Sequence, residues 1–595
     1  MLLWCVILGG IFMFAVALGI GANDVANAMG TSIGSKVLTF RQAIVIAAIF
    51  EFTGATFLGS HVTDTVRSKI VDLNSYIDNP DLLMIVMFSS LIGSAVWLFI
   101  ASYLGMPVST THSIIGAIIG GSLAARGAHG IDGQNVGFIV LSWIISPVGS
   151  GILAAAFFLF CKYVIMRSRN PLKFGFMLLP ILYGVTIFIN IFFIIYKGAP
   201  GLGLDKTPLW VGMVASISSG VFVAGLVIFP GIWLIKKYLS WKEQVVIDYY
   251  TQTTTTNETT NETTINETTI NETTNETTNE TTNETTNETT KYELIMVLRT
   301  DNSNVENNRC VCLNHVNYNE PQLVNIETNE VLKVCHIKSN EIVNSRMLSD
   351  NPPNNFWRKM LHFWFSYNTL LHSDKRDETD GNDSNGGNKC MRCCKIGWKR
   401  FKSIIAYLQG KDNVKSMHST AELFDYKTES LFSVLQVLSA CFDSFAHGAN
   451  DVANAVAPFA AIYAIYTTGQ VTGKSSVETW ILAIGGVGIV VGLALWGSRV
   501  SQTIGVDLIK VTSSRGFCTE LASALSVVVA SRIGFPVSTT HAQIGAVVAV
   551  GLVENRKQVN GRLVLGILIS WLLTIPFAGA ISAAITAIIK AGMGL

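Results

Sequence analysis

The chain has 595 residues, of which only 14% are charged, whereas a typical soluble domain carries about 25%; its mean hydropathy is +0.42. Its 42 Lys and Arg against 41 Asp and Glu leave a formal net charge of +1, so no basic field is present to attract nucleic acid. The composition excludes a string of soluble domains and a nucleic-acid-binding protein, and it predicts a protein that crosses the lipid bilayer many times.

The N-terminal run 2–20 is apolar and is followed by Ala26-Asn27-Ala28, which has the small-residue pattern of a signal-peptide cleavage site. No basic residue precedes this run, and the first Lys of the chain is Lys36. The same triplet recurs deep inside the chain at 453–455. We therefore expect the run to be retained as a membrane helix.

Further apolar stretches of spanning length follow at 42–59, 82–102, 136–161, 174–196, 209–235, 431–447, 479–497 and 563–590. Shorter, broken stretches lie at 107–124, 452–466, 521–533 and 536–553. These are too short to span alone and too apolar for ordinary loops, so they predict half-helices or re-entrant hairpins. The expected fold is an all-α polytopic membrane protein with about twelve transmembrane elements.

A polar insert at 236–430 separates two apolar halves, 1–235 and 431–595. We expect a largely disordered, low-complexity insert, because its tandem Asn-Glu-Thr-Thr copies at 257–290 offer too little apolar surface to offset the cost of ordering. Basic residues at 162–173 and at the start of the insert place the insert in the cytoplasm. The alternative is a glycosylated surface receptor or adhesion protein, since each copy is also an N-x-T acceptor.

The two halves repeat each other. The octapeptide GANDVANA at 21–28 recurs unchanged at 448–455, and PVSTTH at 107–112 recurs at 536–541. Two exact copies in the same order predict a duplicated fold with pseudo-twofold symmetry. Membrane proteins built from such repeats place their binding sites where the halves meet, so we expect the site at this junction.

The octapeptides carry carboxylates at bilayer depth, where each costs about 3 kcal/mol unless it is compensated. Helical spacing puts the neighbouring amides on the same face, and a break at the glycine would free carbonyls beside them. Such an all-oxygen set suits a hard cation. The candidate cation ligands are Asn23, Asp24, Asn27, Asn450, Asp451 and Asn454. The alternative is tight helix packing through small residues, with the polar groups bonded between helices.

The hexapeptides supply the complement. Proline suits the first turn of a helix, while Ser and Thr suit its cap and present hydroxyl and N–H donors to an anion. The candidate anion ligands are Ser109, Thr110, Thr111, Ser538, Thr539 and Thr540. Two carboxylates and one monovalent oxyanion bring about −3 into a low-dielectric site, so anion binding should require cation binding. For His112 and His541 we favour an orienting hydrogen bond over a proton relay.

Two intramembrane acids have no repeat partner, because Glu51 corresponds to Ile489 and Glu520 corresponds to Leu91. Unpaired acids of this kind are functional candidates, with a structural hydrogen bond as the alternative. Asp443 and His447, four residues apart and present only in the second half, predict a mutually satisfied pair.

Taken together, the paired motifs and the acids Glu51 and Glu520 resemble the PiT family of inorganic phosphate transporters, which are sodium–phosphate symporters. The resemblance covers nearly all of 1–236 and 430–595. It implies inverted repeats with helical hairpins, import of phosphate with sodium by alternating access, and a homodimer in the plasma membrane. Its Asn-rich insert is similar to those of malaria-type parasites.

By the same resemblance, phosphate would contact the hexapeptide hydroxyls, sodium the octapeptides, and the two unpaired acids would couple the ions; no cofactor is expected beyond sodium as co-substrate. A proton-coupled phosphate or sulfate carrier is the nearest competitor. No nucleophile–base pair or protease motif is legible, so we do not expect an enzyme. The second octapeptide is followed by 456–459 (Val-Ala-Pro-Phe), unlike 29–32 (Met-Gly-Thr-Ser).

Overall fold

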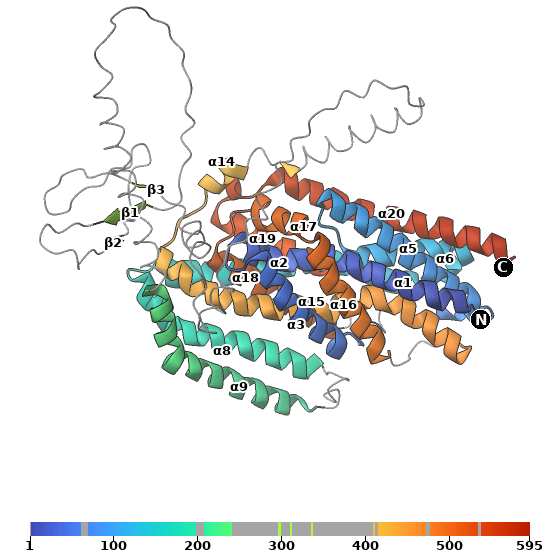
Figure 1. The fold of residues 1–595 in the computed structure, drawn as a ribbon, viewed down its shortest axis with the longest axis horizontal. Helices are drawn as coiled ribbons and strands as arrows, with labels where there is room; N and C mark the ends of the chain where they lie inside the picture. Colours follow the sequence, from blue (N-terminus) through green and yellow to red (C-terminus); the bar gives the residue numbers. More distant parts are fainter. Residues whose placement is uncertain are drawn as a thin grey trace, which may run out of the picture. The chain divides into compact units, whose positions relative to one another are not determined.

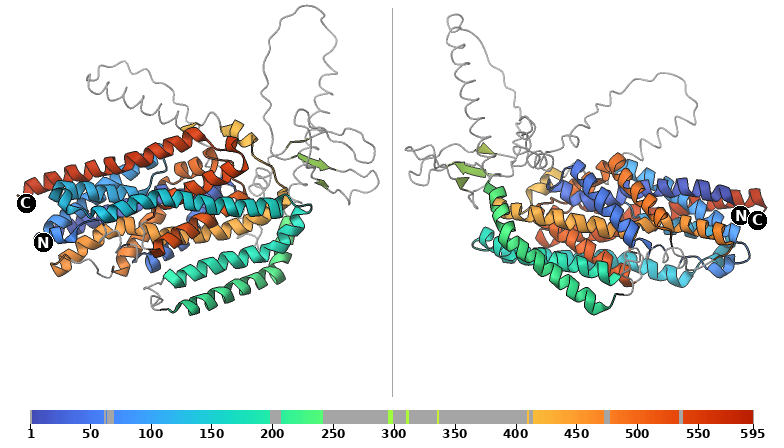
Figure 2. Two further views of the ribbon diagram at one scale, coloured as in Figure 1. Left: turned by 180° about the vertical axis from the view of Figure 1, so that it is seen from behind. Right: turned by 60° about the horizontal axis from the view of Figure 1, so that its bottom comes forward.

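The computed structural model describes residues 2–60, 63, 70–197, 207–240, 409–410, 414–471, 477–533 and 537–594, and the short strands 295–298, 310–311 and 335–336. Its contacts divide the chain into two compact units, Met1–Phe229 with Asn368–Leu595, and Pro230–Tyr367. The first unit is a body of packed helices (Figures 1 and 2). The tract 257–290 lies outside the described residues.

The first half of the body contains α1 (Leu3–Ile20), η1 (Gly21–Val25), α2 (Ala26–Gly34), α3 (Phe40–Leu58), η2 (Leu73–Tyr76), α5 (Pro80–Leu104), α6 (Thr110–Arg126), η3 (Gly127–Gly130), α7 (Gly133–Phe160), η4 (Cys161–Met166), α8 (Pro171–Lys197), α9 (Leu209–Leu226) and η6 (Val227–Gly231). Local signals set several of the boundaries. Thr39 and Gln42 form a reciprocal capping box at the start of α3, and Asn79 caps α5, whose first residue is proline. Gly105 ends α5 in the left-handed conformation, with φ +66°.

The second half contains α14 (Val414–Ser419), α15 (Tyr426–Thr468), α16 (Thr479–Trp496), α17 (Ser498–Gln502), η9 (Thr503–Asp507), α18 (Ser513–Ile533), α19 (Thr539–Glu554), η10 (Arg556–Gln558) and α20 (Gly561–Met593). The stretches 452–466 and 521–533 are not separate half-helices as expected, because they continue α15 and α18. In contrast, α6 and α19 are separate helices of 17 and 16 residues that begin at the hexapeptide turns.

Helices of one half pack mainly on helices of the other: α6 on α20, α19 on α7, α3 on α15, and α1 with η1 on α16. The contacts themselves repeat. A Cβ at Gly448 would collide with the carbonyl of Glu51, and a Cβ at Gly21 would collide with the carbonyl of Ile489. Because Glu51 and Ile489 are equivalent positions, each octapeptide begins at a close helix crossing that only glycine permits.

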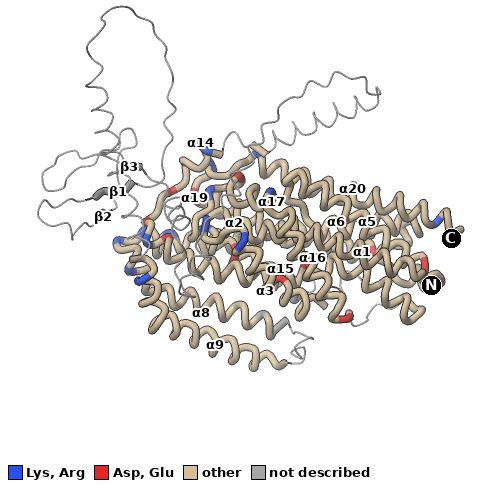
Figure 3. Tube along the Cα trace, viewed as in Figure 1, with Lys and Arg blue, Asp and Glu red and all other residues tan. Residues whose placement is uncertain are grey.

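Eight helices in the described part of the chain are long and apolar enough to cross a membrane: Leu3–Gly34, Phe40–Leu58, Pro80–Leu104, Gly133–Met166, Pro171–Phe192, Leu209–Ser240, Thr479–Trp496 and Gly561–Met593. Large apolar side chains face outward along them, such as Ile152, Phe222 and Leu572. Figure 3 shows Lys and Arg gathered at the α14 end of the body and little charge along its length. The expected all-α membrane architecture is confirmed, while the count of twelve elements and the inverted orientation stay predictions.

The C-terminal end of the insert is tied to the helices of the first unit at successive points. Gln409 Nε2 donates to the Leu104 carbonyl over 3.1 Å, and Asn560 Nδ2 donates to the Gln409 carbonyl over 3.1 Å. His418 Nε2 lies 2.9 Å from the Val506 carbonyl oxygen. We refer to residues 409–410 and 414–425 as the re-entry segment.

The second unit contains a three-stranded antiparallel sheet of order β2-β1-β3. Its strands are β1 (Ile295–Leu298), β2 (Cys310–Val311) and β3 (Cys335–His336). Val297 pairs with Val311, and Ile295 pairs with His336. These short strands within the polar insert were not predicted from the sequence.

Candidate ion site between the two halves

Both octapeptides lie on buried, continuous helices. The first begins the π-helical turn η1 between α1 and α2, and the second runs through α15 without interruption. The expected break at the glycine is therefore wrong. The glycines serve the close crossings described above.

Asp24 accepts hydrogen bonds from both halves of the chain. Thr110 Oγ1 donates to its Oδ2 over 2.5 Å, and Thr540 Oγ1 donates to its Oδ1 over 2.6 Å. The residue is only 2% exposed. One carboxylate therefore joins the first turn of α6 to the first turn of α19, and the two hydroxyls supply part of the compensation that a buried charge requires.

Asp451 is held differently, although it is the equivalent residue. Thr539 Oγ1 donates to its Oδ2 over 2.5 Å, and Asn450 Nδ2 donates to its Oδ1 over 2.8 Å. Both donors come from the second half. Each aspartate therefore accepts from the threonine that begins the helix of its own half. Among the described residues, only Asp24 also accepts from a threonine of the opposite half.

The asparagines three residues later cross to the opposite turn. Asn454 Nδ2 donates to Thr110 Oγ1 and to Thr111 Oγ1, both over 3.1 Å. Asn27 Nδ2 donates to Thr540 Oγ1 over 3.5 Å. The predicted cation residues and the predicted anion residues therefore form one connected cluster at the junction of the halves.

The asparagines before the aspartates hold the turns that precede α6 and α19. Asn23 Oδ1 accepts from the Val108 N–H over 2.9 Å, and its Nδ2 donates to the Met106 carbonyl over 3.0 Å. Asn450 contacts the equivalent residue Val537, but here its Nδ2 donates to the Val537 carbonyl over 3.1 Å. Their predicted role as sodium ligands stays a prediction beside this structural one.

The two predicted serines are helix caps. Ser109 Oγ accepts from the His112 N–H, and Ser538 Oγ accepts from the His541 N–H, each over 3.2 Å. Serine at these positions satisfies one of the free N–H groups at each helix start. The caps present the threonine hydroxyls of both turns to the aspartates.

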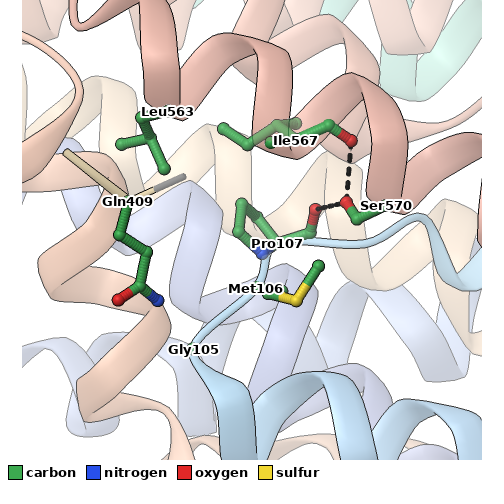
Figure 4. A pocket seen from close by; sticks show the side chains of 8 residues that line it. Gly105, Met106, Pro107, Gln409, Leu563, Ile567 and Ser570 are labelled. Carbon is green, nitrogen blue, oxygen red and sulfur yellow. Dashed lines mark hydrogen bonds between the residues drawn. The ribbon is translucent and has the colours of Figure 1, made fainter. Parts of the chain in front are cut away.

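A small pocket lies between the first turn and α20 (Figure 4). It is lined by Gly105, Met106, Pro107, Gln409, Leu563, Gly566, Ile567 and Ser570. No charged side chain is among these lining residues, so this pocket does not extend the ion site. Ser570 Oγ lies within 3.5 Å of the Pro107 carbonyl oxygen and ties the turn to α20.

His447 links two carboxylates across the halves. Its Nδ1 lies 2.8 Å from Glu51 Oε2, and its Nε2 lies 2.8 Å from Asp451 Oδ2. The expected mutual pair of Asp443 and His447 is therefore wrong, because Glu51 on α3 and Asp451 take the ring nitrogens. Asp443 Oδ2 has no hydrogen-bond partner among the described residues.

Glu520 on α18 is surrounded by hydrogen-bond donors from two helices, α2 and α15. Its carboxylate accepts from Thr31 Oγ1 (2.7 Å), Ser32 Oγ (2.6 Å), Gln436 Nε2 (3.1 Å) and Ser439 Oγ (2.5 Å). Four donors satisfy the Glu520 carboxylate in this conformation, which supports the alternative of a structural hydrogen-bonding role. Its predicted coupling role stays a prediction.

The equivalent place in the other half is apolar throughout. The counterparts of Thr31, Ser32, Gln436, Ser439 and Glu520 are Pro458, Phe459, Gly9, Phe12 and Leu91. A Cβ at Gly9 would meet the Phe459 ring at 3.4 Å, so these counterparts are also neighbours. This explains why the sequences after the two octapeptides differ: one flanks a buried carboxylate and the other a buried leucine.

A second pocket opens beside Asp24 and contains oxygens that lack partners. It is lined by Asp24, Asn27, Ala28, Asp443, His447, Ser523, Val527, Thr539 and Gln543. Asn27 Oδ1, Asp443 Oδ2 and Gln543 Oε1 are buried and have no hydrogen-bond partner in the described chain. Three such oxygens in one pocket, with Asp24 also in its lining, make this pocket a candidate cation site.

The donor set suits a small hard cation. One oxygen each from Asp24 and Asp451 and a ring nitrogen of His447 lie within 4.8 Å of one another. None of the lining residues is Lys or Arg. Carboxylate, amide and hydroxyl oxygens around a cavity are ligands that hard cations prefer. The sequence analysis did not single out Gln543 or Ser523 as lining residues.

The comparisons with known proteins identify the family of the chain. Residues 20–582 match the model of the phosphate transporter family. The chain belongs to the phosphate transporter family. It is 34% identical to sodium-dependent phosphate transporter 1 of Rattus norvegicus, over 99% of this chain and 95% of the relative. It is 35% identical to sodium-dependent phosphate transporter 2 of Xenopus tropicalis, over 99% and 98%.

A solved structure titled "The sodium-dependent phosphate transporter" superposes with a TM-score of 0.63 at 26% identity, covering 99% of this chain and 100% of that one. Together with the spanning helices, family membership identifies an integral membrane protein. The predicted resemblance is confirmed. The prediction that the chain is not an enzyme is also confirmed, because the family and these relatives are transporters.

Proposed function

We propose that this phosphate transporter family member imports inorganic phosphate coupled to sodium ions by alternating access. One observation carries the proposal: Asp24 takes hydroxyl donors from both halves at the edge of a pocket of unpartnered oxygens. The relatives are named for the same substrate and ion. Sodium and phosphate are substrates of the process, and neither is a resident cofactor.

Sodium would bind first, in the pocket beside Asp24. The unpartnered oxygens of Asn27, Asp443 and Gln543 are the ligands that gain most, because each is buried without a partner. Asp24 and Asp451 add two negative charges at this place. His447, which contacts Asp451, supplies the basic side chain nearest to them.

Phosphate would bind at the hexapeptide turns once sodium is present. In this structure the hydroxyl groups of Thr110, Thr539 and Thr540 donate hydrogen bonds to the two aspartates. A cation on the carboxylates competes with those hydrogen bonds, and the freed hydroxyls and the starts of α6 and α19 can then donate to an anion. Coupling follows, because the site without sodium holds neither free donors nor the positive charge that a dianionic or monoanionic phosphate needs.

The test is uptake of radiolabelled phosphate by proteoliposomes that contain the purified full-length protein. We expect uptake with an inward sodium gradient and none when choline replaces sodium. Uptake driven by a pH gradient alone would replace sodium with protons as the coupling ion. Competition by sulfate as strong as that by unlabelled phosphate would overturn the substrate.

A variant sharpens the same assay. Asp24→Asn keeps an oxygen and the size of the side chain but removes the charge that attracts sodium, so uptake should fall to background while the amount of protein at the membrane stays normal. Normal sodium-coupled uptake by this variant would remove Asp24 from the site.

The location and assembly belong to the same proposal. We place the protein in the plasma membrane. The basic residues gathered at the α14 end support a cytoplasmic position for that end and hence for the insert. A shift in mobility after glycosidase treatment would contradict it, since the Asn-Glu-Thr-Thr acceptors would then face the lumen or exterior. The homodimer stays a prediction.

A further inference from the structure

Four aromatic rings form a column beside the hexapeptide turns, two from each half of the chain. The Trp143 and His112 ring centroids are 3.7 Å apart, those of His112 and His541 are 4.4 Å apart, and those of His541 and Trp571 are 3.7 Å apart. The His541–Trp571 pair is stacked at 24°, and the other two pairs are tilted at 32° and 41°. The column runs α7, α6, α19, α20.

The histidines are the residues that directly follow the threonines of the site. Thr111, before His112, accepts from Asn454, and Thr540, before His541, donates to Asp24. Both imidazole rings are almost fully buried. A shift of either ring therefore moves a site hydroxyl on the same helical turn.

Each tryptophan segment touches both turns. The Trp143 ring stacks on His112, and its carbonyl oxygen lies 3.1 Å from His541 Nδ1. Trp571 stacks on His541, while the preceding residue, Ser570, reaches the Pro107 carbonyl of the first turn (Figure 4). The bracing is therefore crossed, with α7 and α20 each spanning the junction between the halves.

The tryptophans are held by their faces. Neither Trp143 Nε1 nor Trp571 Nε1 has a hydrogen-bond partner among the described residues. Buried tryptophans usually place this N–H against an acceptor, so stacking and packing alone fix these two rings. Aromatic contacts of this kind contribute about 0.5–1.5 kcal/mol each beyond the area they bury.

We propose that Trp143 and Trp571 are positioning residues which set the separation of the two threonine turns, so that both can donate to one tetrahedral oxyanion at once. The inference rests on the proposed phosphate function. Stacked planar rings resist compression and sliding more than aliphatic side chains of similar volume, and a misplacement of about 1 Å can cost on the order of a hundredfold in a process that needs aligned donors.

The experiment measures phosphate uptake into proteoliposomes under an inward sodium gradient, with the full-length protein and its variants Trp143→Leu, Trp571→Leu and the double variant. We expect each single variant to raise the KM for phosphate at least about tenfold while the maximal rate per folded molecule changes less than about threefold. The double variant should raise KM little further, because both changes break one column. Trp143→Phe, which preserves a stacking face, should recover most of the lost affinity.

The matched control is Trp210→Leu on α9, because Trp210 is 68% exposed and lies away from the turns. Its KM should equal that of the unmodified protein. If the two column variants lower only the maximal rate or the yield of folded protein, their role is packing and the proposal is wrong. If the unmodified protein shows no sodium-dependent phosphate uptake, the proposed function fails instead, independently of the tryptophans.

Discussion

Asp24 and Asp451 occupy equivalent positions but have different surroundings. Asp24 is bonded to hydroxyls from both halves and faces the pocket of unpartnered oxygens. Asp451 lies against His447, whose counterpart in the first half is Ile20. The basic ring takes part of the space and charge compensation that a cation would supply. We therefore expect the two aspartates to contribute unequally to sodium binding.

Asp443 offers the most direct test of the cation site, because its buried Oδ2 has no hydrogen-bond partner in the described chain. Asp443→Ala should raise the sodium concentration needed for half-maximal phosphate uptake by about tenfold or more, since contacts to charged groups contribute roughly 1.5–3 kcal/mol. Sodium titrations of uptake at saturating phosphate measure this change.

Two further variants frame that prediction. Asp443→Asn keeps an oxygen ligand and should lose less sodium affinity than the alanine variant. Asp78→Asn, which removes an exposed carboxylate outside the pocket, should leave the sodium dependence unchanged. Equal sodium dependence for Asp443→Ala and the unmodified protein would exclude this carboxylate from the cation site.

The sequence could predict the aspartates, asparagines and threonines of the site because exact repetition singled them out. It could not predict the partners of Glu51 or the lining by Gln543 and Ser523. These side chains lie hundreds of residues from Asp24 or Glu51 in the sequence. Only the packing of α3, α15, α18 and α19 brings them together. The presence of Asp443 and His447 in one half alone was a usable signal, but its local interpretation was wrong.

Among the helices, the close crossings at Gly21 and Gly448 hold the octapeptides in register with α16 and α3. Gly448→Ala should destabilise the protein by about 1–3 kcal/mol or more, because the added Cβ would collide with the Glu51 carbonyl and a helix must move. Thermal unfolding of the purified protein in detergent measures the loss.

The control is Gly149→Ala in α7, where an added Cβ meets nothing within 4 Å. Alanine there should be neutral or stabilising by up to about 1 kcal/mol through helix propensity. A melting temperature for Gly448→Ala at or above that of Gly149→Ala would refute the close-crossing role of the octapeptide glycines.

The re-entry segment is joined by charged groups to the end of η4 and to α18. Glu422 accepts from Arg167 Nε over 2.6 Å and lies 2.8 Å from Lys162 Nζ. Arg515 donates to Glu554 over 2.6 Å and to the Glu422 carbonyl over 2.8 Å. Partial burial raises the pKa of the Glu422 carboxyl, but hydrogen bonds from Arg167 and Lys162 outweigh it and hold that pKa below its ordinary value.

This pKa shift gives a pH prediction. Because the folded-state pKa of Glu422 is lowered, its contribution to stability is fully present above the unfolded carboxyl value of about 4.3 and is lost as pH falls through the folded value. The melting temperature of Glu422→Gln should therefore lie below that of the unmodified protein at pH 7, and the difference should shrink below about pH 4. A difference that is constant down to pH 3 would contradict the ion-pair explanation.

The two repeated halves differ at two buried positions, because each half carries one acid whose counterpart in the other half is apolar. The counterparts of Glu51 and Glu520 are Ile489 and Leu91, and all four residues are fully buried. The duplicated fold therefore supplies the frame, while the added carboxylates make one side of the junction polar. The two halves are not interchangeable in the proposed transport cycle.

Deleting residues 257–290 should leave the phosphate KM and the maximal uptake rate within about twofold of the full-length values. The packed halves contain every residue of the candidate site, and the tandem tract contains few apolar residues with which to contact them. Uptake kinetics of the deletion and of the full-length protein, measured in parallel, check this outcome. A large loss of affinity would show that the tract contributes to the transporter after all.

The sequence predicted the membrane class, the two halves and the helical starts at the hexapeptides, because hydropathy, repetition and cap chemistry are local signals. It did not predict that 452–466 continues α15, since a proline and many small residues in that stretch suggested a broken helix. It also gave no indication that α6 packs on α20 and α19 on α7. Such exchange between halves depends on tertiary packing that no local pattern encodes.

The re-entry segment fixes the C-terminal end of the insert to the helices at two places. Gln409 is fastened beside the loop that leads into Pro107, and Glu422 is fastened to the opposite partners Lys162 and Arg167. A protein that bound the insert and displaced its C-terminal end would therefore also displace the loop that precedes α6. The long polar tract can vary freely in length, but its anchorage cannot be altered without disturbing the machinery it adjoins.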